Sequence, residues 1–447
     1  MRAALPHAKL APMPTQRADH AFLPTGWAPG HEAAVAPGGN ATARWRLAGL
    51  PNLHSHAFQR AMAGLAERQS HPEDSFWTWR ELMYRFAGKV TPASQYAIAT
   101  QLYAEMLEAG YTTVCEFHYL HHQPDGRAYD DPAEMSQALI AAAQDTGIRL
   151  TLLPVLYMSG GFDGRPLGER QRRFGHTLDA YLALLQSLRA IPDDRLQVGI
   201  ALHSLRAVPE PALREVLAAV GADRLPIHIH IAEQIGEVQD CLALRGARPV
   251  EWLLDHAAVD ARWTLVHATH LEAQEVQGIV RSGATVALCP STEANLGDGL
   301  FPLRDYLQAG GHWGIGSDSH VSVSPVEELR WLEYGQRLAT RRRNIAVSAQ
   351  QPSTGELLYA QALQGGLRAC GQAAAAAGDF IVLDDTAPAL AGATPADLLD
   401  RFVFAGNRSL VRETHVGGER LVAEGRHRDR EAVARRYAQA LRALLAD

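Results

Sequence analysis

The chain has 447 residues, of which 47% are hydrophobic and 20% are charged, so it carries ample apolar surface for a large core and lacks the composition of a disordered protein. Its net charge of −7 gives no basic signature for nucleic acid, and no run of 18 apolar residues is available to cross a membrane. The four cysteines are dispersed without a Cys-x-x-Cys pair, which is typical of reduced thiols. We therefore expect a cytoplasmic protein that binds neither nucleic acid nor membranes.

The first 46 residues contain Pro and Gly clusters at 24–30 and 37–39 that could separate short strands, and we interpret residues 1–46 as part of a small β domain. From residue 47 to 370, apolar strand-like segments alternate with segments of helical periodicity. The strand-like segments end near residues 56, 118, 157, 203, 230, 267, 289 and 318. Eight such units predict an α/β fold, a (β/α)₈ TIM barrel, whose catalytic residues lie at the carboxyl ends of the strands. The Gly-rich segment 159–175 is long enough to be an active-site loop.

The end of the chain changes character. Beyond residue 371, short apolar runs at 380–384, 402–404 and 419–422 are split by Gly, Pro and Asp, and we interpret them as strands. A helix is expected over 428–445. Residues 371–447 therefore complete, together with residues 1–46, a small accessory β domain formed from both chain ends, beside a barrel of residues 47–370.

Metal-type side chains recur at the predicted strand ends. Because side chains alternate along a strand, His54 and His56 point to the same side and can chelate one ion, although a lone His-x-His also occurs by chance. His230 ends another apolar run, and Asp318 follows the eighth one. The combination predicts a mononuclear metal site that keeps an open position for water. A bound divalent ion lowers the pKa of that water towards neutrality.

Two further residues could move protons at such a site. Glu233 follows His230 by three residues, and His267 ends the next strand-like run, where it could hydrogen-bond a developing tetrahedral centre. This arrangement can attack an sp² carbon that bears nitrogen and expel ammonia or an amine. A simpler interpretation of Glu233 is a solvated carboxylate in the first turn of a helix, where acids are favoured. His228, deeper on the strand of His230, is more often a core residue than a ligand.

The motifs PNLHSHAFQRAMAG at 51–64, HIAE at 230–233, His267 and GSDSHVS at 316–322 resemble the amidohydrolase superfamily in its deaminase branch. More narrowly, the continuation AFQR at 57–60 resembles the members that hydrolyse N-formimino-L-glutamate. The resemblance runs from about residue 45 to 345 and more loosely to the end of the chain.

The resemblance implies one Zn²⁺ per chain and a homodimer. It places zinc at His54, His56, His230 and Asp318, with Glu233, His267 and Asp318 in catalysis, and substrate contacts at Gln59, Arg80, Tyr119, His203 and Arg206. Tyr119, His203 and Arg206 fall at or just past predicted strand ends, whereas Arg80 would otherwise be an ordinary helix arginine.

The implied reaction converts the small dianionic substrate N-formimino-L-glutamate into N-formyl-L-glutamate and ammonia, as in histidine degradation. Two alternatives stay open. One is an aminohydrolase for a purine, pyrimidine or related heterocycle at the same metal centre, and the more remote one is a non-catalytic binding protein on this fold.

Overall fold

The computed structural model describes residues 14–35, 42–69, 72, 75–221 and 223–446. Residues 1–13 and 36–41, which belong to the predicted amino-terminal part of the β domain, lie outside these described residues. No helix in the described ranges is long and apolar enough to span a bilayer.

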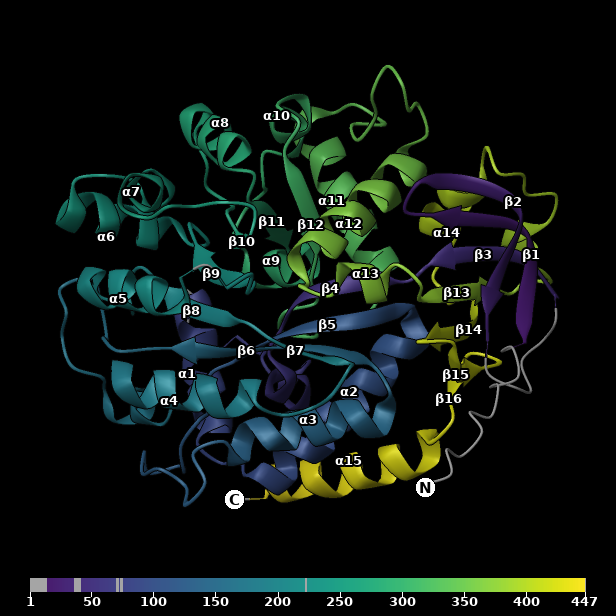
Figure 1. Ribbon diagram of the computed structural model, residues 1–447. Helices are drawn as coiled ribbons and strands as arrows, with labels where there is room; N and C mark the ends of the chain where they lie inside the picture. The colour runs from purple at the N-terminus through teal and green to yellow at the C-terminus, as the bar shows by residue number, and fades with distance from the viewer. Residues whose placement is uncertain (1–13, 36–41, 70–71, 73–74, 222, 447) are drawn as a thin grey trace, which may run out of the picture.

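Eight parallel strands close into a barrel, which confirms the predicted fold class (Figure 1). In their order around the sheet they are β4 (Leu50–Ser55), β5 (Tyr111–His118), β6 (Arg149–Leu156), β8 (Ile200–Ser204), β9 (Ile227–Ile231), β10 (Trp263–His267), β11 (Thr285–Leu288) and β12 (His312–Ile315). The short strand β7 (Leu196–Val198) pairs with β6 just before β8. The seam between the first and last strands closes beyond the end of β12, where Ser55 and Asp318 form a parallel bridge.

Helices surround the barrel (Figure 1). They are α1 (Phe76–Ala87), α2 (Pro92–Ala109), α3 (Glu134–Thr146), α4 (Leu178–Arg189), α5 (Glu210–Val220), α6 (Ile235–Arg245), α7 (Pro249–His256), α8 (Ala273–Ser282), α9 (Pro290–Leu296), α10 (Leu303–Gln308), α11 (Pro325–Thr340), α12 (Thr354–Ala369) and α13 (Ala373–Ala376), with the 3₁₀ helices η1 (Ala57–Met62) and η2 (Glu169–Phe174). Their ends follow local chemistry: the side chains of Ser75 and Thr91 cap the amino termini of α1 and α2, and Gly110 ends α2 with φ +105°. Three of these helices, α7, α9 and α13, have no counterpart among the elements predicted from the sequence, and η2 lies inside the segment expected to be a loop.

A second sheet gathers strands from both chain ends and lies beside the barrel, in purple and yellow in Figure 1. Its strand order is β16 (Arg426–His427), β15 (Glu419–Ala423), β14 (Val411–Val416), β13 (Phe380–Leu383), β3 (Thr42–Ala48), β1 (Thr15–Leu23) and β2 (Gly26–Ala34). A buried ion pair ties it to the barrel, since Arg149 Nε on β6 lies 2.6 Å from Asp379 Oδ2 beside β13. The last helix, α15 (Arg430–Leu445), returns to pack on α2.

One predicted strand is wrong. Residues 402–404 belong to a helix, α14 (Leu398–Phe404), which follows the short 3₁₀ helix η3 (Pro388–Leu390). Phe402 and Val403 are buried, and α14 packs on α11 and α12. A run of three apolar residues has no period of its own, so packing against these two helices decides its conformation.

Candidate metal centre and active site

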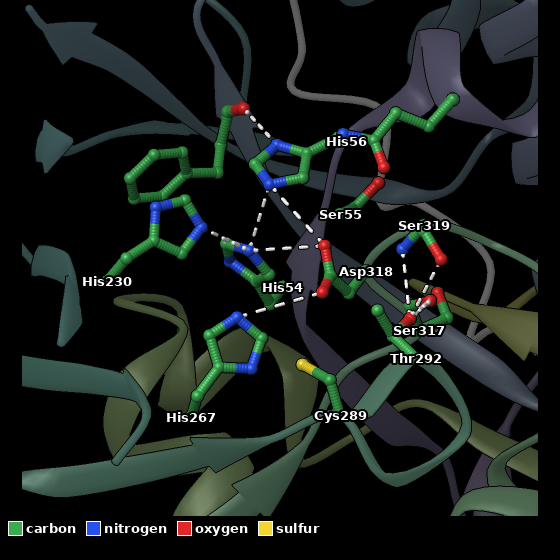
Figure 2. A network of polar contacts seen from close by, with 12 residues as sticks. His54, Ser55, His56, His230, His267, Cys289, Thr292, Ser317, Asp318 and Ser319 are labelled. Atoms are coloured by element: carbon green, nitrogen blue, oxygen red, sulfur yellow. Dashed lines mark hydrogen bonds and ion pairs between the residues drawn. The ribbon is translucent and has the colours of Figure 1, made fainter. Parts of the chain in front are cut away.

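The four predicted ligands meet at the carboxyl end of the barrel. His54 lies on β4, His56 follows that strand directly, His230 lies on β9, and Asp318 lies beyond β12. His54 Nε2 is 3.1 Å from His56 Nε2 and 2.9 Å from His230 Nε2. Asp318 Oδ1 is 3.6 Å from His54 Nε2 and 3.5 Å from His56 Nε2. All four side chains are buried, and Figure 2 shows them facing one another.

The hydrogen bonds of the outer ring nitrogens show that this donor set fits a divalent cation. His56 Nδ1 lies 2.8 Å from the carbonyl oxygen of Phe117, and His230 Nδ1 lies 3.0 Å from that of His203. A carbonyl only accepts, so both Nδ1 atoms carry the proton and both Nε2 lone pairs point inward. Burial lowers the pKa of His56 to about 3 and that of His230 well below its usual value, which keeps both rings neutral. Converging lone pairs beside a carboxylate repel one another unless a cation lies between them.

The backbone around the centre is strained. Asp318 has φ +47° and His267 has φ +68°, and three close neighbours of the centre, Ala232, Ala268 and His320, also have positive φ. Each such residue costs on the order of 1–3 kcal/mol and persists only where its surroundings hold it. The strain therefore marks the ends of β9, β10 and β12 as the functional edge of the barrel.

His267 connects the centre to two further carboxylates. Its Nε2 lies 3.7 Å from Asp318 Oδ2 and 3.8 Å from Glu233 Oε1, and its Nδ1 lies 3.3 Å from Glu293 Oε1. Burial alone would lower the pKa of His267, but Glu233, Glu293 and Asp318 raise it to about 10. Glu233 keeps 14% of its side chain exposed, so it borders the space from which a substrate would approach. The two residues predicted to move protons thus lie together beside the ligands.

Three of the residues expected to contact substrate line the same edge. Gln59 Nε2 donates to Tyr119 Oη at 2.9 Å, and the Tyr119 ring lies 4.9 Å from the His56 ring. The His203 ring lies 5.2 Å from that of His230. The structure therefore brings these neutral groups against the predicted ligands His56 and His230.

The two expected arginines lie on the side of His203. Within the described residues, neither Arg80 nor Arg206 has an ion pair or a side-chain hydrogen bond, and Arg80 Nε is buried without a partner. Arg80 is held instead by the rings of Trp77 and Tyr84, whose centroids lie 4.5 Å and 5.4 Å from its guanidinium carbon. After burial, the charge of Arg206 and then, more weakly, that of Arg80 help to lower the pKa of His203. Both positive charges thus act on one region of the site, and the charge of Arg206 also lowers the pKa of the buried Glu237 carboxyl, which burial raises.

Glu293 belongs to the site although its sequence pattern did not single it out, and His228 lies apart from the site. Glu293, on α9, contacts His267, and the only signal for it was an acidic residue shortly after the end of a strand. His228 is buried with its Nε2 3.4 Å from the carbonyl oxygen of Ala369, and it lies outside the groups that could hold an ion among the described residues.

Three histidines and a carboxylate at the strand ends of a (β/α)₈ barrel, with His267 and Glu233 beside them, define the class of metal-dependent barrel hydrolases. The comparisons with known proteins agree with this class. The chain matches the amidohydrolase family over residues 45–365, and it belongs to that family. It is a hydrolase that acts on C–N bonds.

Individual relatives narrow the comparison. The chain is 53% identical to the formimidoylglutamate deiminase of Pseudomonas aeruginosa, over 96% of this chain and 99% of that protein. It is 26% identical to a 5-methylthioadenosine/S-adenosylhomocysteine deaminase of Natronomonas pharaonis, over 86% and 83% of the two chains. Among solved structures, an amidohydrolase from Brucella melitensis is similar with a TM-score of 0.91 and 44% identity, covering 97% of this chain and all of that one. A zinc-containing adenosine deaminase from Xanthomonas campestris shares the fold, with a TM-score of 0.78, 20% identity, and coverage of 97% and 99%.

Proposed function

We propose that this chain hydrolyses N-formimino-L-glutamate to N-formyl-L-glutamate and ammonia, and that His54, His56, His230 and Asp318 hold one Zn²⁺. The observation that carries the proposal is the pair of arginines, Arg80 and Arg206, which form no ion pair within the described residues and whose charges act on His203 beside this donor set. Arginine presents a planar fork that matches a carboxylate, and the substrate carries two carboxylates. The identity of 53% to a formimidoylglutamate deiminase supports the same substrate.

The proposed chemistry divides between two sides of the site. When bound, a divalent ion supplies charge that lowers the pKa of water towards neutrality and so provides a nucleophile for the formimino carbon. Among the chain's own residues, Arg80 and Arg206 hold the dianionic end of the substrate, and Gln59, Tyr119 and His203 are neutral partners that fix its orientation. With the carboxylates held there, the formimino carbon at the other end of the substrate lies towards Glu233 and His267.

Glu233 is suited to carry the proton between the two halves of the reaction. Its Oε1 lies 3.8 Å from His267 Nε2, and its side chain borders solvent. It accepts a proton as water adds to the formimino carbon and passes that proton to the imino nitrogen, which becomes an amino group. The proton left on the added hydroxyl then passes by the same carboxylate to this nitrogen, so that the C–N bond breaks, the formyl C=O forms and ammonia leaves. His267, close to both Glu233 and Asp318, stabilises the charge that develops between them.

Three finer expectations from the sequence also belong to this proposal: zinc as the ion in the cell, a cytoplasmic location, and a homodimer. The four cysteines are buried and unpaired, which fits a reducing compartment. Analytical ultracentrifugation of the purified protein tests the homodimer, and elemental analysis of protein purified without added metal tests the zinc.

The deciding experiment is an ammonia-release assay on purified protein with N-formimino-L-glutamate, adenosine-type nucleosides and free nucleobases as separate substrates. The proposal expects turnover of the formimino compound, its loss after treatment with a chelator, and its return with Zn²⁺. Turnover of a heterocycle instead would replace the proposal with the aminohydrolase alternative. Binding of the formimino compound without turnover, unchanged in an Asp318→Ala variant, would support a non-catalytic binding protein.

A further inference from the structure

Glu293 lies behind His267, on the side away from the expected substrate. Its Oε1 is 3.3 Å from His267 Nδ1, and it also accepts a hydrogen bond from the backbone nitrogen of Cys289 at 2.9 Å. Both Glu293 and His267 are nearly fully buried, with 4% and 1% of their surface exposed. Water therefore screens little of the interaction between them.

The orientation of His267 matters because its two ring nitrogens face different groups. Nδ1 faces Glu293, while Nε2 faces Glu233 and Asp318 at 3.8 Å and 3.7 Å. An ionised carboxylate only accepts hydrogen bonds, so the contact with Glu293 requires the proton to sit on Nδ1. The backbone of His267 is strained at φ +68° and persists only where its surroundings hold it, and the contact with Glu293 is one that holds this residue.

We infer that Glu293 is a positioning residue that holds the direction of the His267 ring by accepting a hydrogen bond from Nδ1, so that Nε2 is presented to the reacting groups. The inference rests on the proposed function for its catalytic consequence, although the contact itself does not depend on the substrate. With Glu293 in place, Nδ1 is held by a carboxylate and Nε2 faces Glu233 and Asp318. Without it, no carboxylate holds Nδ1, and the ring can turn away from these two groups.

A purely structural role for Glu293 is the competing explanation, because its contact with Cys289 supports the amino terminus of α9. The chain supplies a matched control for that role. Glu328, on α11, accepts hydrogen bonds from the backbone nitrogen of Ser291 at 2.8 Å and from Ser291 Oγ at 2.6 Å. It supports the same turn of α9 as a fully buried carboxyl group but makes no contact with His267.

The test compares Glu293→Gln with Glu328→Gln in the zinc-loaded enzyme. Glutamine keeps the size and one acceptor of the side chain but removes its charge and lets the amide donate. For Glu293→Gln we expect kcat to fall by at least about 100-fold, with KM within about twofold of wild type, because the change affects a group that orients a catalytic histidine. For Glu328→Gln we expect kcat within about threefold of wild type. Zinc content should equal that of wild type in both variants.

A proton NMR measurement tests the inference without using turnover. A buried imidazole N–H donated to a carboxylate gives a resonance far downfield, and the one from His267 is identified by its loss in His267→Gln. We expect this resonance in wild type and Glu328→Gln, and its shift or loss in Glu293→Gln. Wild-type protein without such a resonance, or equal kcat values in the two glutamine variants, would overturn the inference. Failure of wild type to release ammonia from N-formimino-L-glutamate would instead refute the proposed function, while the NMR result still decides the role of Glu293.

Discussion

Replacing Arg206 or Arg80 with methionine should separate a dianion pocket from any other use of this site. Methionine keeps much of the apolar stem and removes the guanidinium. Neither arginine forms an ion pair within the described residues, so a substrate carboxylate could form a direct ion pair with each. Removing one charged partner of a buried, hydrogen-bonded pair costs about 2–5 kcal/mol. At about 1.36 kcal/mol for each factor of ten, the lower limit corresponds to a loss of about thirtyfold in kcat/KM.

The assay measures kcat/KM by ammonia release for two substrates. One is N-formimino-L-glutamate, and the other is N-formimino-4-aminobutyrate, which has the same chain length but lacks one carboxylate. Wild type should prefer the dianion. The arginine that binds the missing carboxylate should matter little for the second substrate, so its methionine variant should lose at least about tenfold of that preference, whereas the other variant should slow both substrates alike.

Arg85→Met is a matched control, because Arg85 lies on the same helix as Arg80 but is exposed in its last turn. It should leave both rate constants within about twofold of wild type. If Arg80→Met and Arg206→Met both keep the full wild-type preference for the dianion, the two arginines do not bind the two carboxylates of the substrate. The substrate assignment would then lose the observation that carries it.

Three further changes test the metal centre, the ion pair between the barrel and the second sheet, and the buried carboxyl group of Glu328. Gly316→Ala would place a Cβ 2.7 Å from the Cβ and backbone nitrogen of His54, so it should displace this ligand and lower the zinc content measured by elemental analysis, with circular dichroism as the check on folding. Arg149→Met should destabilise the chain by about 3–5 kcal/mol in urea unfolding because it leaves the Asp379 carboxylate buried and unpaired, and unchanged stability would contradict this. Burial raises the pKa of Glu328 from 4.5 to about 8, so folded wild type binds the extra proton and loses stability as pH rises through that interval. Glu328→Gln should lack this loss, so its stability relative to wild type should increase between pH 5 and pH 8 in denaturant unfolding.

The barrel could be predicted because its strands and helices alternate in regular units that are separated by Gly, Pro and other turn residues. The predicted strand ends near 118, 230 and 267 lie within one residue of the ends of β5, β9 and β10. Short elements carry no such signal. Residues 402–404 fit a strand or a helix equally well by pattern, and α14 owes its conformation to contacts made by residues far along the chain, such as Arg330, which donates to the carbonyl oxygen of Val403.

The site shows the same division. His54, His56, His230 and Asp318 could be predicted as one group because each lies at or just beyond the end of a strand, and parallel strands of a barrel end on one face. Glu293 could not, because an acidic residue in the first turn of a short helix is common for reasons of helix stability alone. Its role depends on the distance to His267, which only the packed barrel sets.

The metal centre and the closure of the barrel depend on the same contacts. Asp318 lies beyond β12, and its backbone nitrogen donates to the carbonyl oxygen of His54 at 2.9 Å while its own carbonyl accepts from the nitrogen of His56 at 3.2 Å. The strained φ of Asp318 turns the chain so that these two bonds form and the carboxylate faces both imidazoles. An ion bound by these side chains would therefore tie the first strand of the barrel to the segment that follows the last one. Because ligand binding to the folded state stabilises that state, metal affinity and barrel stability are linked through this seam.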